Sequence, residues 1–204
     1  MRLILASASP RRAELLRAAG YAFDVVVADV DESIRPGESP ATYVRRLAAE
    51  KSAAAQSQVV SGFSRTGEGP PEGGRHLQVI LGADTTVVVD GEILGKPRDD
   101  RDGAMMLRRL SGRTHQVLTG VSLRQGAYEL GRVETTDVAF RALTDEDVAW
   151  YVASGEGRDK AGGYAIQGLA SRFIQRIDGS YSNVVGLPVA CIAELLPEIR
   201  HGGG

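Results

Sequence analysis

Residues 78–94, QVILGADTTVVVDGEIL, decide the fold. Two runs rich in β-branched residues surround the tripeptide that ends at Asp84, which is typical of a buried strand, and the Asp-Gly pair at 90–91 favours a tight hairpin turn. We therefore expect a long strand that returns as a hairpin. A carboxylate in such a run is costly to bury unless it is paired or binds a metal ion, so Asp84 is a candidate functional residue. A turn aspartate with satisfied hydrogen bonds is the other interpretation.

The segments on either side alternate between strands and helices. Further strands are expected at residues 2–6, 24–30, 114–123 and 128–141, with a last hairpin at 171–182. Helices are expected from Pro10 to Gly20, from Pro40 to about Gln56, at about 100–111, from Thr144 to Ser154 and from about Pro188 to Arg200. Strands and helices in this order predict an α/β fold with a mixed sheet.

The composition excludes several classes of protein. The chain has 204 residues, with 24 Lys plus Arg against 26 Asp plus Glu, so it lacks the basic field that non-specific binding of nucleic acid or of an anionic membrane needs. The single cysteine, Cys191, cannot form an intrachain disulfide, and we expect it to be buried in a protein of a reducing compartment. No apolar stretch approaches the ~20 residues of a membrane span. We therefore expect a cytoplasmic protein of one domain, residues 1–204, with no stable nucleic-acid or membrane partner.

Two segments are expected to lack a fixed structure. Between residues 57 and 77 the composition shifts to Ser, Gly and Pro. Such a segment buries too little apolar surface to offset the entropy cost of ordering it, which predicts a mobile surface loop inserted in the domain. Residues 201–204, at the end of the chain, are expected to fray.

The sequence SASPRR, residues 7–12, joins the first strand to the first helix. Backbone N–H groups at a helix start attract anions, by ~0.3–1 kcal/mol from the helix dipole, and arginine adds charged hydrogen bonds. Ser7, Arg11 and Arg12 are therefore candidates for binding phosphate. An ordinary Ser-Pro helix cap with two solvated arginines is the alternative.

Two lysines are candidates for the same anion. Lys51 follows Val44 and Leu47 at helical spacing, so it lies on the apolar face of the second helix. Its ammonium either extends along the edge of the core or points into a cleft that holds an anion. Lys96 follows the predicted hairpin, which allows it to approach Asp84 across the turn.

Other polar residues lie at the predicted ends of strands. Glu32 follows the second strand and is either an oxygen ligand for a hard cation or a solvated loop residue. Gln167 lies in a glycine-rich stretch, and its amide can accept from the N3–H of uracil or thymine while donating to a carbonyl. The Thr85 hydroxyl can add a contact to the same ring. A structural turn amide is the alternative for Gln167.

Seven motifs follow one another along the chain: SASPRR, LAAEKS, GADTTV, LGKP, LSGRTHQVLTGV, DKAGGYAIQG and GSYSNVVGLP. Together they resemble the Maf family of nucleoside triphosphate pyrophosphatases over nearly the whole chain, with residues 57–77 as an insertion. The resemblance implies an elongated, two-lobed α/β fold similar to that of inosine triphosphate pyrophosphatases, with a central cleft. It also implies hydrolysis of a nucleoside triphosphate to the monophosphate and pyrophosphate.

The resemblance implies a role for individual residues. In the subgroup that acts on dTTP and UTP, a threonine follows the GAD aspartate and a glutamine lies in the late glycine-rich segment, and these are Thr85 and Gln167 here. Arg11 matches the arginine that sets specificity, and Asp84 matches the proton acceptor. The other matches to active-site positions of the family are Ser7, Arg12, Glu32, Lys51 and Lys96.

We therefore predict a house-cleaning dTTP and UTP pyrophosphatase. Asp84, Lys96 and Lys51 are its expected catalytic residues, and Glu32 and Asp84 are expected to bind Mg²⁺ or Mn²⁺ as cofactor. A nucleoside triphosphate is the expected partner, and a homodimer is left open. The alternatives are a purine-selective pyrophosphatase acting on ITP or methylated GTP, and a non-catalytic regulator of septum formation that senses a nucleotide.

Overall fold

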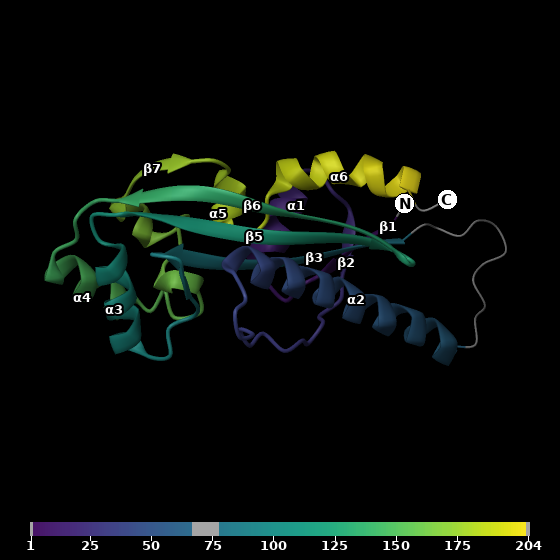
Figure 1. Ribbon diagram of the computed structural model, residues 1–204, viewed down its shortest axis with the longest axis horizontal. Coiled ribbons are helices and arrows are strands. Elements are labelled where there is room, and N and C mark those ends of the chain that lie inside the picture. Colours follow the sequence, from purple (N-terminus) through teal and green to yellow (C-terminus); the bar gives the residue numbers. More distant parts are fainter. Residues whose placement is uncertain (1, 67–77, 203–204) are drawn as a thin grey trace.

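A mixed sheet runs along the length of the molecule in the computed structural model, which describes residues 2–66 and 78–202 (Figure 1). Its strands are β1 (Arg2–Ala6), β2 (Phe23–Val25), β3 (Gln78–Val89), β4 (Glu92–Leu94), β5 (Thr114–Gln125), β6 (Tyr128–Phe140) and β7 (Ile174–Asp178). The order across the sheet is β2-β1-β3-β5-β6-β7, and β4 pairs with β3. The β1–β2 and β1–β3 pairs are parallel and the other pairs are antiparallel, so the predicted mixed α/β sheet is confirmed.

Strand β3 is the centre of the sheet, as its sequence predicts. It pairs with β5 over residues 80–88. On its other edge, β1 pairs with residues 78–82 and β4 pairs with residues 87–89, so residues 83–86 lie between the two partners. The turn into β4 has φ angles of 53° at Asp90 and 78° at Gly91, the left-handed values that a tight hairpin of this kind requires. The backbone of β3 is therefore open to a ligand in the middle of one edge.

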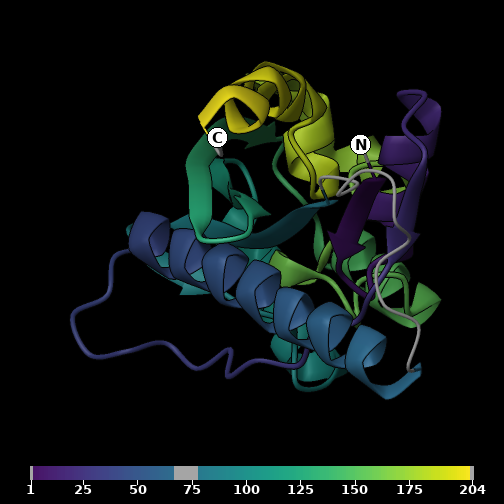
Figure 2. The same ribbon diagram turned by 90° about the vertical axis from the view of Figure 1, so that its right-hand side faces the viewer.

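Helices cover both faces of the sheet. They are α1 (Pro10–Ala18), α2 (Pro40–Thr66), α3 (Asp100–Leu110), α4 (Asp145–Ser154), α5 (Tyr181–Val185) and α6 (Val189–Gly202), with 3₁₀ turns η1 (Ala161–Gly163) and η2 (Leu169–Phe173). Helix α2 crosses one face and α6 lies on the other (Figure 2). Within the ranges that the structure describes, none of the helices combines the length and apolarity that a membrane crossing requires.

Two apolar clusters divide the molecule into two lobes. One gathers Leu5, Leu81, Ile192 and their neighbours between β1, β3, β5 and α6. The other gathers Leu107, Phe173 and their neighbours around α3, α4 and the far ends of the central strands. The two clusters lie toward opposite ends of the long strands in Figure 1, which gives the elongated, two-lobed form that the resemblance implies. Cys191 lies in the first cluster and is buried, as expected.

Two glycines let α2 lie directly on the sheet. A Cβ added at Gly82 would stand 2.1 Å from the carbonyl oxygen of Ala48, and one at Gly120 would stand 2.2 Å from that of Val44. Because backbone meets backbone at both positions, no larger residue fits without moving the helix. This close contact brings Lys51 of α2 beside Asp84 of β3.

The loop predicted for residues 57–77 is wrong over residues 57–66, which form the last turns of α2. Val59 packs against the apolar cluster that contains Ile4 and Ile80. Ser61 donates its hydroxyl to a carbonyl oxygen one turn earlier, at 2.8 Å. Apolar contact and satisfied serine hydroxyls therefore extend the helix beyond the point where composition alone ends it. The rest of the predicted loop lies outside the described residues.

Three other expectations change at the ends of elements. Strand β2 ends at Val25 and not at residue 30, because it is an edge strand that pairs with β1 over three residues. Residues 171–182 form part of η2, then β7 and the start of α5, and not a hairpin, because β7 pairs with β6. Helix α6 ends at Gly202 and not at about Arg200, so the fraying expected from residue 201 stays a prediction, and the last two residues lie outside the described chain.

Candidate active site

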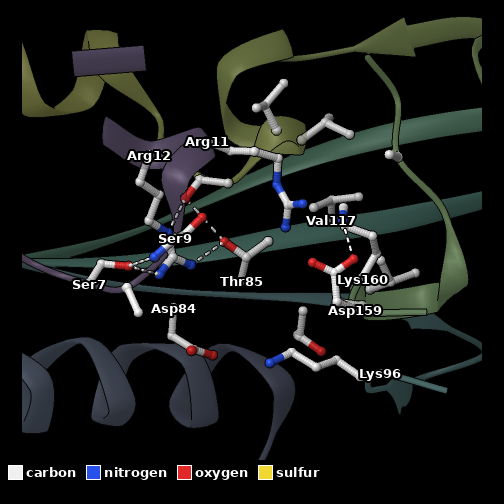
Figure 3. Close-up of a pocket in the computed structure, with 18 of the residues that line it drawn as sticks. Ser7, Ser9, Arg11, Arg12, Asp84, Thr85, Lys96, Val117, Asp159 and Lys160 are labelled. Carbon is white, nitrogen blue, oxygen red and sulfur yellow. Dashed lines mark hydrogen bonds and ion pairs between the residues drawn. The ribbon is translucent and has the colours of Figure 1, made fainter. Parts of the chain in front are cut away.

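A cleft of about 490 Å³ opens beside residues 83–86 of β3, where the sheet edge has no strand on one side (Figure 3). It contains all the site residues predicted from the sequence: Ser7, Arg11, Arg12, Glu32, Lys51, Asp84, Thr85, Lys96 and Gln167. Side chains from both lobes line the cleft. The predicted central cleft is therefore confirmed, and the predicted residues meet in it.

The elements that carry these residues explain why they converge. Ser7 follows the last residue of β1, and Arg11 and Arg12 lie in the first turn of α1. Asp84 and Thr85 are successive residues of β3, so their side chains leave opposite faces of the strand. We call the buried side chains Ser7, Arg12, Lys51 and Asp84 the near wall, each at most 9% exposed. The far wall comprises Lys96, Asp159, Lys160 and Gln167, from the loop after β4 and the segment around η1.

Lys51 joins two carboxylates. Its Nζ donates to Glu32 Oε1 at 2.6 Å and to Asp84 Oδ1 at 2.7 Å. Lys51 and Asp84 are each 8% exposed, whereas Glu32 exposes 53% of its side chain. Partial burial pushes the pKa of Glu32 up, but the hydrogen bond and the charge of Lys51 outweigh it and hold that pKa below its usual value. The lysine on the apolar face of α2 therefore points into the cleft and does not extend to solvent.

The donor set fits a divalent cation shared with a ligand. Among residues 2–66 and 78–202, no group of three or more His, Cys, Asp or Glu side chains forms a metal site of its own. Mg²⁺ commonly takes one or two carboxylates and completes its shell with phosphate oxygens and water. Glu32 and Asp84 come from different elements and already converge on one cation, the Lys51 ammonium. The two carboxylates therefore suit a metal ion that arrives with a phosphate ligand.

Arg12 joins several segments of the chain at the near wall. It donates to the carbonyl oxygens of Gly186 and Ala83, each at 2.8 Å, and to the hydroxyls of Ser7 and Thr85, each at 3.1 Å. Burial lowers the pKa of the guanidinium, although the nearby Asp84 charge acts in the other direction. The alternative of a solvated arginine is therefore wrong for Arg12. Most of its donors serve the protein itself, which makes it a fixed positive charge behind the ligand.

Arg11 behaves differently from its neighbour. Its guanidinium projects into the cleft toward Asp159 in Figure 3, and its positive charge helps to lower the pKa of that aspartate. The hydrogen bond from Lys160 is the larger cause of the same lowering. The two adjacent arginines therefore have separate places: Arg12 is buried in the near wall, and Arg11 projects into the open space of the cleft.

The hydroxyl of Thr85 has no proton free for a ligand. Its Oγ1 accepts from Arg12 at 3.1 Å, lies 2.9 Å from the hydroxyl of Thr119 and lies 3.3 Å from the carbonyl oxygen of Gly186. If Thr119 donates to Thr85, the Thr85 proton goes to Gly186. If Thr85 donates to Thr119, the Thr119 proton goes to the carbonyl oxygen of Asn183 at 3.2 Å. The Thr85 proton is used inside the protein in both arrangements.

Three residues that position or line the site were missed from the sequence. Asp159 and Lys160 pair with each other on the far wall. Arg46 of α2 holds the loop that carries Glu32, since it donates to both carboxylate oxygens of Glu38, at 2.6 and 2.8 Å, and to the carbonyl oxygen of Ser33 at 3.0 Å. The Asp-Lys pair at the start of the glycine-rich motif was a usable signal. Nothing local distinguishes Arg46 from other charged residues of the helix.

Known proteins match this chain over nearly its whole length. The family model described as "Maf-like protein" matches residues 2–199. The dTTP/UTP pyrophosphatase of Anaeromyxobacter dehalogenans (strain 2CP-C) is 50% identical over 199 residues, which is 96% of this chain and 92% of that protein. The dTTP/UTP pyrophosphatase of Escherichia coli O157:H7 is 50% identical over 194 residues, with 95% and 91% covered. The nucleoside triphosphate pyrophosphatase of Shigella flexneri is 49% identical over 194 residues, which is 95% of this chain and 91% of that protein.

A solved structure is a more distant match. The Staphylococcus aureus Ham1 protein aligns with 69% of this chain and 72% of its own, with a TM-score of 0.45 and 15% sequence identity. A likeness at that level carries no argument about this chain. The similarity to inosine triphosphate pyrophosphatases therefore stays a prediction, while the mixed sheet and the cleft stand on the structure itself.

Proposed function

This chain belongs to the Maf-like protein family, and on that premise we propose that it is a nucleoside triphosphate pyrophosphatase that hydrolyses dTTP and UTP. One observation carries the proposal: Lys51 holds Glu32 and Asp84 together at the open edge of β3, in a cleft lined by further cations. A site that only sensed phosphate would need the cations. It would have no use for a pair of carboxylates facing the same space.

The cations of the cleft suit a triphosphate. Arg11, Lys96 and Lys160 come from three separate segments and line one cavity, with Arg12 fixed behind them. A triphosphate carries several negative charges along its length, and cleavage depends chiefly on positioning and on neutralising that charge. Side chains that reach from both walls can hold the α-phosphate and the leaving pyrophosphate at the same time.

Asp84 is the proposed proton acceptor. A water oxygen forms a bond to the α-phosphorus, the bond from the α-phosphorus to the bridging oxygen breaks, and pyrophosphate leaves with that electron pair. Asp84 takes the proton of the water, and Lys51 holds the carboxylate in place through its hydrogen bond. Because Asp84 and Lys51 are both buried, this geometry is fixed before the ligand binds.

Glu32 and Asp84 are the residues that would hold Mg²⁺ or Mn²⁺. When bound, such an ion supplies positive charge against the phosphate oxygens. Lys51 donates to one oxygen of each carboxylate, so it keeps the two close to each other despite their like charge. Arg46 of α2 helps to position Glu32, because it holds the loop that carries this residue against the helix.

Pyrimidine selectivity is assigned to Gln167 and Thr85. Uracil and thymine present an N3–H donor, whereas cytosine presents an acceptor at that atom. The Gln167 amide lies exposed on the far wall and offers both an acceptor and donors. The Thr85 hydroxyl has no proton free to donate to the acceptor at N3 of cytosine. Together with the acceptor oxygen of Gln167 it therefore favours a ring that donates a proton.

We also propose a cytoplasmic enzyme without a stable nucleic-acid partner. The support is the free, buried Cys191 and the near balance of acidic and basic residues. A homodimer stays a prediction from the sequence.

A nucleotide panel tests the proposal. Pyrophosphate release is measured with Mg²⁺ for dTTP, UTP, CTP, ITP and methylated GTP, beside a sample without metal. We expect the largest kcat/KM for dTTP and UTP and little release without metal. Faster turnover of ITP or methylated GTP would favour the purine-selective enzyme. No release from any nucleotide would overturn the proposal and favour the nucleotide-sensing regulator of septum formation.

A further inference from the structure

One carboxylate braces the segment that carries Gln167 from both sides. Glu156 Oε1 accepts the backbone N–H of Leu169 at 2.9 Å, two residues after Gln167. Glu156 Oε2 accepts the hydroxyl proton of Tyr151 at 2.8 Å. The oxygen of that hydroxyl accepts the backbone N–H of Ala165 at 3.1 Å, two residues before Gln167. Both flanks of the glutamine are therefore tied to a single anchor.

The two side chains of this brace, Glu156 and Tyr151, are held in place by the end of α4. Tyr151 is 1% exposed, near the end of α4. Burial and the hydrogen bond to Glu156 both raise the pKa of its hydroxyl, so the group stays a proton donor. Helix α4 ends at Ser154, and Gly155, with a φ of 73°, turns the chain. The backbone N–H of Glu156 then donates to the hydroxyl of Ser154 at 3.2 Å. The carboxylate is thus aimed by the end of a packed helix.

The residue after Gln167 is shaped to admit the carboxylate. A Cβ added at Gly168 would stand 2.0 Å from Glu156 Oε1 and 2.7 Å from Oε2. Any other residue would therefore push the carboxylate away from the Leu169 N–H. Ile166 is buried on one side of this segment and Ala170 on the other, whereas Gln167 itself is exposed in the cleft.

We infer that Glu156 and Tyr151 are positioning residues that hold the Gln167 amide against the base and so set the preference for uracil and thymine. The inference rests on the proposed function. It separates selectivity from chemistry, because neither Glu156 nor Tyr151 lines the cleft. Loosening the brace lets the Gln167 amide turn, which weakens recognition of N3–H and leaves Asp84 and Lys51 in place.

Kinetics of four single variants test the inference. Tyr151→Phe removes the hydroxyl of the brace, Glu156→Gln leaves one acceptor oxygen where the brace uses two, Gly168→Ala displaces the carboxylate from the other side, and Gln167→Ala removes the amide. We expect KM for UTP to rise about fivefold in each, the effect of one lost hydrogen bond, with kcat within about twofold of the wild type. The preference for UTP over CTP falls by a similar factor. Glu194→Gln, which breaks an exposed ion pair with Arg132, is the control and should change neither value.

A double variant distinguishes positioning from general support of the fold. If Glu156 acts through Gln167, adding Glu156→Gln to Gln167→Ala changes KM for UTP by less than about twofold. Full additivity, or an equal loss of kcat for UTP and CTP, would overturn the inference. So would unchanged UTP preference in both Glu156→Gln and Gly168→Ala. Gly168→Ala keeps the test decisive if Tyr151→Phe fails to fold.

The proposed function is judged separately in the same experiment. A wild-type chain that hydrolyses UTP and dTTP while the brace variants keep its selectivity contradicts the inference alone. A wild-type chain that hydrolyses neither contradicts the proposed function, and the positioning role with it.

Discussion

The two walls of the cleft are built differently. The near wall is buried, and its charged side chains Arg12, Lys51 and Asp84 form hydrogen bonds with distant parts of the chain, such as the bond from Arg12 to Gly186, 174 residues away. On the far wall, Lys96, Asp159 and Gln167 are exposed, and Lys160 pairs with its own neighbour, Asp159. The difference suggests a division of work. Chemistry needs buried groups fixed before the ligand binds, whereas recognition can use exposed side chains on a backbone that is held, such as Gln167.

Replacing Asp84 by Asn should have the largest effect, because it removes the proton acceptor from the near wall. We expect kcat for UTP to fall by about 10²- to 10⁴-fold, the usual range for general-base catalysis. The Asn side chain keeps the size of the Asp side chain and Lys51 keeps its bond to Glu32, so the protein should still fold. Its midpoint of thermal unfolding should be lower, because Lys51 loses one of its two carboxylates. Steady-state pyrophosphate release and thermal unfolding give the two values.

The matched control is Asp145→Asn on α4, whose carboxylate is 87% exposed and pairs with Arg108. It should leave kcat unchanged. Retained turnover in Asp84→Asn would remove Asp84 from the catalytic role and leave the near wall as a binding surface.

Lys51→Met should come next and should affect both stability and rate. The substitution keeps the length of the side chain but leaves Asp84 buried beside Glu32 with no ammonium between them. Removing one partner of a buried ion pair costs about 3 kcal/mol of the free energy of unfolding. We also expect kcat to fall at least tenfold, because the position of the Asp84 carboxylate is lost. Denaturant unfolding and steady-state kinetics measure the two losses.

An exposed ion pair provides the comparison. Arg109→Met on α3 breaks the ion pair between Arg109 and Glu92, in which the arginine side chain is 39% exposed and the glutamate side chain 69%. That loss should be at most about 1 kcal/mol. Equal losses in Lys51→Met and Arg109→Met would contradict the claim that the near wall is held by buried charge.

The same contrast explains what the sequence could predict. Asp84 in an apolar strand and Lys51 on an apolar helix face are each costly unless they find a partner, and each is the partner of the other. Such residues are visible because they violate the local pattern. The contacts of Arg12 with Gly186 and of Glu156 with Leu169 leave no such mark, since they depend on how distant segments pack.

The errors have the same origin. The turns of α2 after residue 56 were read as a loop because their composition is polar, while their stability comes from Val59 packing on the sheet. Asp159 and Lys160 resemble ordinary solvated charges, and their place in the cleft depends on η1 lying beside β3 and α3. Local pattern therefore predicted the elements and the near wall better than the far wall.

Lys160→Met tests the far wall and should have a moderate effect. Arg11 and Lys96 remain in the same cleft after the substitution, so the triphosphate loses one of several cations. We expect KM for UTP to rise about tenfold, which corresponds to the low end of one charged hydrogen bond, with kcat within about twofold of the wild type. A loss of kcat as large as that of Lys51→Met would show that the far wall takes part in the chemistry and would remove the division between the walls.

The smallest effect is expected at the exposed loop that carries Glu32 and lies beside the near wall. The hydrogen bond from Arg46 is the main cause that lowers the pKa of Glu38 to about 2, from an ordinary value of 4.5. Since the folded state binds this proton less readily than the unfolded state, the contribution of Glu38 to stability is complete above about pH 4.5 and is lost as the pH falls toward 2. Glu38→Gln removes the titrating group, so its midpoint of thermal unfolding should fall less steeply between pH 4.5 and 2 than that of the wild type. Near pH 7 the variant should be the less stable of the two. Parallel slopes across that interval would mean that the Arg46–Glu38 pair does not hold the loop, and the position of Glu32 would then depend on its other contacts, such as the bonds from Lys51 and from the Tyr43 hydroxyl.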